Sequence, residues 1–462
     1  MPTTRWADEP EPRRLPDVHY ARSGDVAVAY QVVGSGSRDV VFLRGLTGDL
    51  LSTWDQPLLV RHVEGLASNG RLLMLDRRGT GLSDRLREVP SVESSMDDIR
   101  AVMDAEGSEQ AVIWTGATAT AVAALFAATY PDRVAGLVLF DPRACGVAQP
   151  DYPWAPSEAQ TRERLAAIRR SWGDRDFMGD LAREYAPEVA DDEAFIDWLV
   201  WHLRRSLSPG AALTAARFEM ELDIRDVLSA VRVPTLLLAH PQRPAQARYL
   251  ADRIAGSKLV DLPSLRGIYT WVDDACHEAT MEATADFIAG LGSAADPERV
   301  LATILFTDIV GSTELTARLG DARWREVLER HHSVVRRTLA RYSGREIDTV
   351  GDGFFASFDG PARAVRAALV VVEELAELGI DVRAGLHTAE FEVADGKLAG
   401  IGVNIGARIA ATAAAGEVLV SSTVKDLVAG SGIRFEERGI HRLKGVPAER
   451  TLYAAKRSDP AP

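Results

Sequence analysis

Short apolar runs alternate with helical stretches through the first 290 residues of the chain. The runs are mainly aliphatic or aromatic and occupy Val40–Leu43, Leu72–Leu75, Ala111–Trp114, Gly136–Phe140, Thr235–Leu238 and Lys258–Leu262. Strands joined by helical crossovers form a largely parallel sheet that is covered on both faces. We therefore predict a doubly wound α/β domain over residues 26–290, preceded by a polar segment, 1–25. Trp, Arg and Glu recur at helical spacing in residues 150–228, which predicts a helical cap over the sheet.

The remaining pattern predicts a second domain over residues 299–457, after a short linker at 291–298. A strand-like run from Ala302 ends at Asp308, and a helical pattern then opens at Gly311. Two further apolar runs, Ile347–Val350 and Phe354–Phe358, flank a Gly-Asp-Gly tripeptide. Apolar runs separated by such a tripeptide indicate a hairpin whose tip carries Asp352.

Composition excludes several classes of protein. A chain of 462 residues suits two domains that each bury a core. The net charge of −14 argues against nucleic-acid or anionic-membrane binding, which requires basic clusters. Only Cys145 and Cys276 are present, too few for a disulfide framework, so a reducing, cytoplasmic location is expected. We see no signal peptide and no run of about 20 apolar residues that would span a membrane.

Two carboxylates stand at turns where a metal-bound triphosphate would fit. Asp308 directly precedes the helix start at Gly311–Thr313, whose open backbone N–H groups can bind phosphate. Asp352 lies at the hairpin tip, and hard oxygen ligands suit Mg²⁺ or Mn²⁺. Each feature alone has a plainer explanation, because Asp is common at helix caps and in hairpin turns.

Three blocks in order resemble the catalytic domain of class III nucleotidyl cyclases, the adenylate and guanylate cyclases. They are F-T-D-I-V-G-S-T at 306–313, V-G-D-G at 350–353 and G-I-G-V-N-I-G-A-R-I at 400–409. The resemblance implies an α+β, ferredoxin-like domain that converts ATP to 3′,5′-cyclic AMP and pyrophosphate. It also implies a homodimer with active sites between the subunits.

The resemblance assigns roles to individual residues of this chain. Two metal ions, Mg²⁺ or Mn²⁺, would be held by Asp308, Ile309 and Asp352. The triphosphate would be bound by Gly311, Ser312, Thr313 and Lys444, although an exposed Lys in a turn is commonly without a role. Asn404 would fix the ribose and Arg408 would stabilise charge on the α-phosphate. An Asn and an Arg at this spacing share one face of a helix.

The positions that read the base depart from the adenylate cyclase pattern. Adenylate cyclases usually carry Lys four residues before the second metal Asp and Asp three residues before the Gly of the last block. This chain has Asp348 and Lys397 there, so the charges are exchanged. The exchanged pair still supplies one acceptor and one donor to adenine, and guanine also fits such a pair. Asp395 is an alternative acceptor, and an Asp348–Lys397 ion pair without a role in base reading remains open.

Three segments of the first domain resemble α/β-hydrolases: D-R-R-G-T-G-L-S-D from Asp76, F-A-A-T-Y-P-D-R-V from Phe126 and V-P-T-L-L-L from Val233. That family places a nucleophilic Ser on a sharp strand-to-helix turn, with an acid and a His later in the chain. Here the nucleophile position is Ala117, the His position falls at Arg266–Gly267, and the oxyanion His is replaced by Arg44. No Asp or Glu follows Thr235–Leu238, so hydrolysis is not expected.

We therefore expect an adenylate cyclase with a non-hydrolytic regulatory or scaffold domain. A pocket between sheet and cap is the default place for a small-molecule ligand. The alternatives are a guanylate or relaxed-specificity cyclase, a nucleotide-binding pseudoenzyme sensor, and an N-terminal domain kept only for packing.

Overall fold

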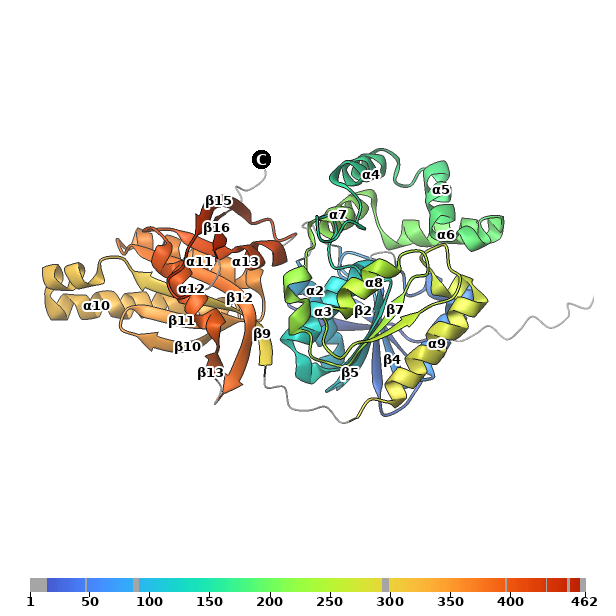
Figure 1. Ribbon diagram of the computed structural model, residues 1–462, viewed down its shortest axis with the longest axis horizontal. Helices are drawn as coiled ribbons and strands as arrows, with labels where there is room; N and C mark the ends of the chain where they lie inside the picture. Colours follow the sequence, from blue (N-terminus) through green and yellow to red (C-terminus); the bar gives the residue numbers. More distant parts are fainter. Residues whose placement is uncertain are drawn as a thin grey trace, which may run out of the picture.

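The computed structural model describes residues 15–457, apart from 46–47, 86–90, 293–298, 395–396, 429 and 447–448. It leaves the side chains of 118, 393, 394 and 397 undescribed. Two layered domains lie side by side, the first on the right and the second on the left (Figure 1). The predicted linker, residues 291–298, lies mostly outside the described residues. No helix among those that are described is long and apolar enough to cross a membrane.

The first domain is built on an eight-stranded sheet with the order β1-β2-β4-β3-β5-β6-β7-β8. Its strands are β1 (His19–Ser23), β2 (Val26–Val33), β3 (Asp39–Leu43), β4 (Arg71–Leu75), β5 (Ala111–Gly116), β6 (Val134–Phe140), β7 (Thr235–Ala239) and β8 (Lys258–Asp261). Strands β3 to β8 are parallel, and β1 and β2 join antiparallel at one edge. The predicted doubly wound sheet is confirmed, and β1 lies inside the segment 1–25 that we expected to precede it.

Helices cover both faces of this sheet, as its buried strands require. One face is covered by α1 (Pro57–Ala67) and α9 (Asp274–Ala289), and the other by α2 (Val92–Ala105), α3 (Thr120–Thr129) and α8 (Pro244–Ala251). Four further helices stand above the sheet (Figure 1): α4 (Glu158–Ser171), α5 (Arg175–Tyr185), α6 (Glu193–Ser206) and α7 (Pro209–Glu221). They form the cap that the composition of residues 150–228 predicts.

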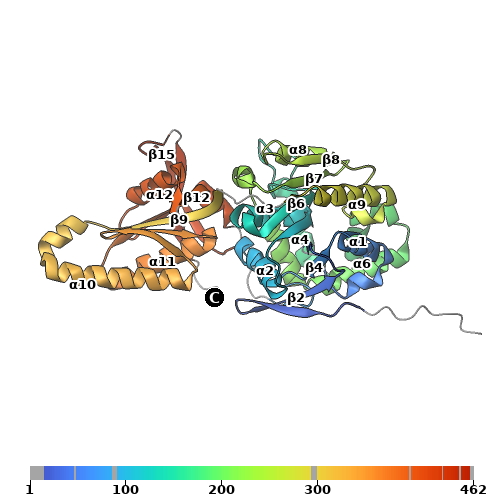
Figure 2. The same cartoon turned by 90° about the horizontal axis from the view of Figure 1, so that it is seen from below.

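The second domain has a mixed sheet with the order β10-β11-β9-β12-β14-β16-β15, and β13 pairs with β12. Its strands are β9 (Arg299–Ile309), β10 (Arg345–Val350), β11 (Gly353–Phe358), β12 (Val382–Ala394), β13 (Lys397–Ala399), β14 (Val418–Ser421), β15 (Arg434–His441) and β16 (Arg450–Lys456). Helices α10 (Ser312–Arg341), α11 (Pro361–Glu377) and α13 (Ser422–Leu427) pack with one face, whereas α12 (Ile401–Thr412) packs on the other (Figure 2).

Side chains of β9 alternate between these two faces. Leu305 and Ile309 belong to the core under α10 and α11, and Ile304 lies against Gly406 of α12. Because the alternation has a period of two, Asp308 points to the α12 side. The strand therefore delivers its terminal carboxylate to the more open face of the sheet.

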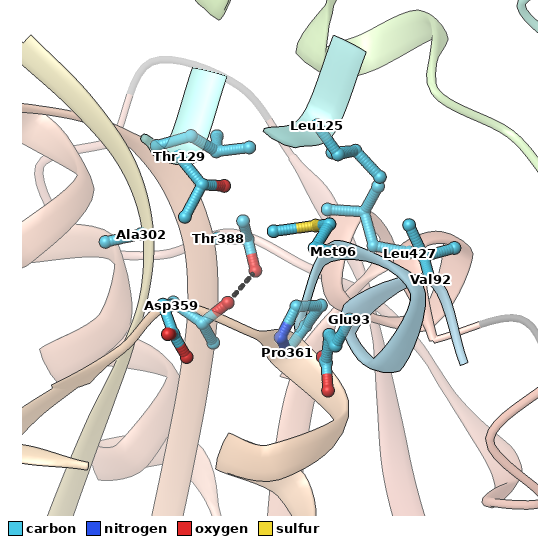
Figure 3. A pocket seen from close by; sticks show the side chains of 12 residues that line it. Val92, Glu93, Met96, Leu125, Thr129, Ala302, Asp359, Pro361, Thr388 and Leu427 are labelled. Carbon is cyan, nitrogen blue, oxygen red and sulfur yellow. Dashed lines mark hydrogen bonds between the residues drawn. The ribbon is translucent and has the colours of Figure 1, made fainter. Parts of the chain in front are cut away.

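The two domains are in contact along α2, α3 and the start of α11 (Figure 3). The Glu93 carboxylate of α2 accepts hydrogen bonds from the backbone N–H groups of Ala362 and Arg363, which begin α11. Tyr130 donates to Asp359 at 2.5 Å. A carboxyl side chain of one domain thus accepts the first N–H groups of a helix of the other, which satisfies donors that the helix leaves unpaired.

Candidate functional site

The two candidate metal ligands meet at the end of β9. Hairpin β10–β11 pairs with β9, which brings its tip beside Asp308. The Oδ2 atom of Asp352 accepts a hydrogen bond from the backbone N–H of Ile309 at 3.3 Å. Gly351 has φ +63°, a left-handed conformation that the tight turn needs. His332 of α10 contacts the carbonyl oxygen of Gly351 at 3.1 Å and so fixes the tip from outside the hairpin.

Asp308 forms an ion pair that the sequence analysis missed. Arg383 stands opposite Asp308 in the β9–β12 ladder, and its Nη2 atom lies 2.6 Å from Asp308 Oδ2. Its Nη1 atom also donates to the carbonyl oxygen of Ala411, near the end of α12, at 3.3 Å. Arg383 therefore balances the charge of the carboxylate and ties it to α12.

The predicted phosphate-binding turn is the first turn of α10. Gly311 occupies the N-cap position with φ +66°, and no side chain caps the helix. The helix is interrupted at Gly320, where φ is +73° and ψ is +161°. Residues 312–319 thus form a short separate helix whose first N–H groups lack intrahelical partners. Its N-terminus follows directly after β9 and the Asp308 carboxylate.

These residues fit Mg²⁺ or Mn²⁺ bound together with a nucleotide. Asp308 and Asp352 supply carboxylate oxygens, and Ile309 supplies a backbone carbonyl. In the described ranges no group of three or more His, Cys, Asp or Glu side chains could hold a metal ion. Mg²⁺ commonly takes one or two carboxylates and completes its octahedron with water and substrate phosphates. The donor set therefore suits a metal ion that would be shared with the phosphates of a nucleotide.

The other predicted residues form a separate group on α12. Asn404 and Arg408 are exposed, one turn apart, while Ile405 and Ile409 are buried toward the sheet. Across the described residues, neither exposed side chain has a hydrogen bond or ion pair to Asp308 or Asp352. Exposed Lys444 lies in a turn whose neighbouring apolar residues pack with Ile405 and Ile409. One chain thus presents two separate groups of candidate residues, which we call half-sites: one contains the carboxylates, and the other contains the Asn, Arg and Lys.

The two expected base-reading positions lie on different rows of the sheet. Pairing across β10, β11, β9 and β12 puts Asp348 level with Gly385. Lys397 pairs with Ala394, which follows Gly385 by nine residues, a span of about 30 Å along a strand. The strand register therefore separates the backbone positions of Asp348 and Lys397 along the sheet. The side chain of Lys397 and the whole of Asp395 lie outside what the structure describes.

The first domain keeps the backbone of a nucleophile turn without a nucleophile. Ala117 follows β5 directly and has φ +44°, a conformation that costs energy for any residue except glycine. Ala117–Ala119 form a single 3-10 turn that leads into α3. His240 occupies the expected acid position and is fully buried. Burial lowers the pKa of its imidazole, and its Nε2 atom contacts the carbonyl oxygen of Gly267 at 2.8 Å.

The position of the missing catalytic His is closed by the cap. A Cβ atom added at Gly267 would stand 2.4 Å from the carbonyl oxygen of Tyr185, at the end of α5. Glu188 of the same cap segment accepts the backbone N–H of Gly267 at 3.0 Å and that of Arg266 at 2.5 Å. No side chain fits here unless the cap moves. This steric reason was invisible in the sequence, where only the identity of the residue could be read.

A large cavity nevertheless remains between the sheet and the cap. Its volume is about 1220 Å³, and its walls include the end of β5, the loops after β3 and β6, and all four cap helices. Arg44, at the oxyanion position, is buried beside it, with its guanidinium 2.7 Å from Asp76 and 2.8 Å from Thr53 Oγ1. The cavity that we expected between the sheet and the cap is present. Contacts with Asp76 and Thr53 hold Arg44 in place beside it.

Comparison with known proteins identifies both domains. The family described as the adenylate and guanylate cyclase catalytic domain matches residues 297–456, and the alpha/beta hydrolase fold matches residues 40–197. Putative adenylate cyclase 3 of Rhizobium meliloti (strain 1021) is 32% identical over 164 residues, which are 32% of this chain and 27% of that relative. The chain thus spans about a quarter of that protein's length.

Two further comparisons concern the first domain. The putative carbamate hydrolase RutD of Caulobacter sp. (strain K31) is 28% identical over 257 residues, which are 52% of this chain and 88% of that protein. The solved structure of the esterase EaEST from Exiguobacterium antarcticum matches with a TM-score of 0.52 at 17% identity, over 60% of this chain and 100% of its own. At that identity the likeness shows the fold alone. Residues 297–456 are therefore an adenylate and guanylate cyclase catalytic domain, and the domain before them has the α/β-hydrolase fold.

Proposed function

We propose that the protein is an adenylate cyclase that converts ATP to 3′,5′-cyclic AMP and pyrophosphate. The observation that carries the proposal is the contact between Asp352 Oδ2 and the backbone N–H of Ile309. It gathers two carboxylates and one carbonyl oxygen directly before the uncapped helix start at Gly311. A site of this kind holds a triphosphate with its divalent cations and leaves the α-phosphorus open to attack.

The reaction joins the ribose 3′-oxygen to the α-phosphorus and breaks the bond to the pyrophosphate oxygen. When bound, Mg²⁺ or Mn²⁺ supplies charge stabilisation and favours the ionised 3′-hydroxyl. The N–H groups from Gly311 to Thr313 hold the β- and γ-phosphates, with Lys444 at the terminal phosphate. Asn404 orients the ribose, and Arg408 stabilises the charge that develops on the α-phosphate.

We propose that each active site is completed by a second copy of the chain. Among the described residues, Asn404 and Arg408 form no hydrogen bond or ion pair with Asp308 or Asp352. The two carboxylates are half-buried, whereas Asn404 and Arg408 are exposed. Between them the sheet presents Phe306 stacked on Phe355 at 4.6 Å, partly open to solvent. Val350 and Ile401 are 76% and 57% exposed at the edges of the same region. Exposed apolar side chains beside incomplete sites are what a two-fold dimer would bury.

We also propose that the α/β-hydrolase-like domain is a non-hydrolytic regulatory or scaffold domain. Ala117 has no nucleophilic atom, and the cap fills the space at Gly267. Glu93 binds the start of α11, and α3 packs against β9, whose far end carries Asp308. The domain is therefore attached to the element that bears a metal ligand, which favours regulation over an independent accessory role.

The choice of ATP over GTP rests on the family, because the exchanged charges at Asp348 and Lys397 fit either base. A guanylate or relaxed-specificity cyclase is therefore the alternative, and a nucleotide-binding pseudoenzyme sensor is the second. The test is incubation of the purified full chain with ATP or GTP, each with Mn²⁺ or Mg²⁺, followed by chromatography of the cyclic nucleotide. Cyclic AMP is expected. Cyclic GMP alone would select the first alternative, and bound but unconverted nucleotide would select the second.

A further inference from the structure

Four buried polar atoms at the cavity of the first domain have no hydrogen-bond partner among the described residues. They are Nε of Arg44, Nδ1 of His62, Nε of Arg143 and Oε1 of Gln246, and all four residues line the cavity. Arg44 is 8% exposed and Gln246 is 4% exposed. Buried polar groups in folded proteins are nearly always paired, because an unpaired group loses its hydration without compensation. Together these atoms mark a place where a polar ligand group would be stabilised.

The sheet brings the two arginines to either side of Ala117. Leu43 of β3 pairs with Thr115 of β5, and Phe140 of β6 pairs with Gly116. The residues after β3 and β6 therefore flank the residue after β5. Gln246 follows on α8, behind the end of β7, and its amide can turn either its oxygen or its NH₂ group to the cavity. The floor of the cavity is thus a compact polar patch around a side chain that is only a methyl group.

The charge on this floor is not balanced within the described chain. Arg44 is paired with Asp76 at 2.7 Å, and Arg243 is paired with Asp141 at 2.8 Å. The guanidinium of Arg143 forms no hydrogen bond or ion pair with any described residue, so the floor carries one uncompensated positive charge. The acidic residues that line the cavity all come from the cap helices: Glu163, Asp180, Glu184 and Glu219. On the cap side Glu184 is paired with Arg164, and Arg266 lines the cavity as well, so the uncompensated Arg143 makes the floor the place that favours an anionic group.

The walls above the floor are mainly aromatic and aliphatic. The aromatic side chains that line them include Trp154, Trp172, Phe177, Trp198, Tyr269 and Trp271. The indole N–H of Trp172 is already bonded to the carbonyl of Leu207 and that of Trp198 to the carbonyl of Ser52, so both present their apolar faces. The volume of about 1220 Å³ exceeds the range of about 300–1,000 Å³ that is usual for small-molecule sites. An extended apolar body fits above the charged floor.

We propose that this cavity binds an amphipathic carboxylic acid, with its carboxylate at Arg143, beside Arg44 and Gln246, and its apolar body between the cap aromatics. The ligand is held without covalent chemistry, since Ala117 offers no nucleophile. Binding does not depend on the activity of the second domain, so it stands or falls separately from the proposed cyclase reaction.

The experiment is a titration of the full chain with decanoate, followed by tryptophan fluorescence and by calorimetry. 1-Decanol, which has the same chain length without the charge, and acetate, which has the charge without the chain, are titrated in parallel. Decanoate should bind saturably and at least about tenfold more tightly than decanol, because it gains a charge-assisted hydrogen bond, while acetate should not saturate. Absence of saturable decanoate binding, or equal affinity for decanol, would overturn the proposal.

Variants at one position separate the headgroup contact from the integrity of the cavity. Arg143→Gln should weaken decanoate binding about tenfold or more and leave decanol binding unchanged, whereas Arg143→Lys should recover part of the loss. Arg170→Gln, on the exposed face of α4, is the matched control and should bind decanoate like the wild type. Decanol binding by Arg143→Gln shows that the cavity is still formed. If Arg143→Gln binds decanoate normally, the carboxylate is not held at this arginine and the proposal is wrong.

Discussion

The cyclase domain and the hydrolase-like domain differ in which part of an active site they contain. The cyclase domain has the residues that we propose for its chemistry, but one chain divides them between the end of β9 and the exposed face of α12. The hydrolase-like domain has a large cavity and a strained turn at Ala117, but the Ser, the acid and the His of a hydrolase triad are absent from their expected positions. A strained φ of +44° persists without a nucleophile to position. The backbone geometry of the turn is therefore retained without the catalytic side chains, and the cavity of the hydrolase-like domain can serve for binding.

The largest effect should come from emptying a metal position. Asp308→Ala or Asp352→Ala should reduce formation of cyclic AMP by at least about a thousandfold, because one carboxylate ligand is lost. The activity is measured at saturating Mn²⁺ and ATP. Asp321→Ala, which removes an exposed carboxylate just beyond the break at Gly320 in α10, is the control and should remain active. Undiminished turnover in either metal-ligand variant would contradict the assignment.

Mixing two inactive variants tests whether the half-sites of different chains combine. Asp308→Ala and Arg408→Ala subunits place both lesions in one site of a mixed dimer and leave the other site intact. Random exchange should restore about a quarter of wild-type activity, since half of the dimers are mixed and each has one intact site. Subunit exchange is verified with two affinity tags. No recovery after verified exchange would mean that the catalytic residues act within one chain.

The domain interface should respond to pH through Glu93. Burial raises the pKa of this carboxyl from 4.5 to about 7, although the N–H groups of α11 favour its charged form. A raised acid pKa stabilises the fold below about pH 4.5, and this contribution, on the order of 3 kcal/mol, is lost as the pH rises through about 7. Glu93→Gln should therefore flatten the fall of the thermal midpoint between about pH 5 and pH 8.

Exposed Glu109 provides the matched control for this measurement. Glu109→Gln should keep the wild-type dependence of the thermal midpoint on pH. An unchanged slope in Glu93→Gln would show that the carboxyl of Glu93 does not titrate in this range within the folded protein.

A smaller effect is expected at the exchanged charges. Asp348→Lys and Lys397→Asp should change the ratio of ATP to GTP turnover independently, because their rows of the sheet are about 30 Å apart. A double-mutant cycle on kcat/KM for both nucleotides measures the coupling. A coupling above about 0.5 kcal/mol would require that the two side chains meet across the subunit interface.

No effect at all is expected from restoring the nucleophile. Ala117→Ser should leave short acyl esters uncleaved, because neither the acid nor the His is restored and position 267 has no room for a side chain. The assay is release of p-nitrophenol compared with buffer. A burst of product that depends on the new hydroxyl would show that other groups of the cavity replace the triad.

The sequence predicts the elements and the local motifs because these depend on neighbouring residues. Short apolar runs indicate the strands, and the turn residues indicate the hairpin at Asp352 and the helix start at Gly311. Arg383 could not be found in this way, because it meets Asp308 through a strand pairing between positions 75 residues apart. The resemblance to adenylate cyclases also paired Lys397 with Asp348 as base-reading residues, whereas the length of β12 decides the row of the sheet on which Lys397 lies. The closure of position 267 by Tyr185 is likewise a contact between distant segments.

Helix α11 takes its N-terminal cap from the other domain. Its own N-cap residue, Gly360, offers no side chain, and the carboxylate that binds Ala362 and Arg363 belongs to Glu93. The side chains of Leu301 in β9 and Leu427 in α13 likewise pack in the hydrophobic core of the first domain. The two domains therefore do not separate into independent folding units at the linker. A cyclase fragment that starts at residue 293 would lack the side-chain cap of α11 and would expose Leu301 and Leu427 to solvent. Its structure would therefore differ from that of the domain in the full chain.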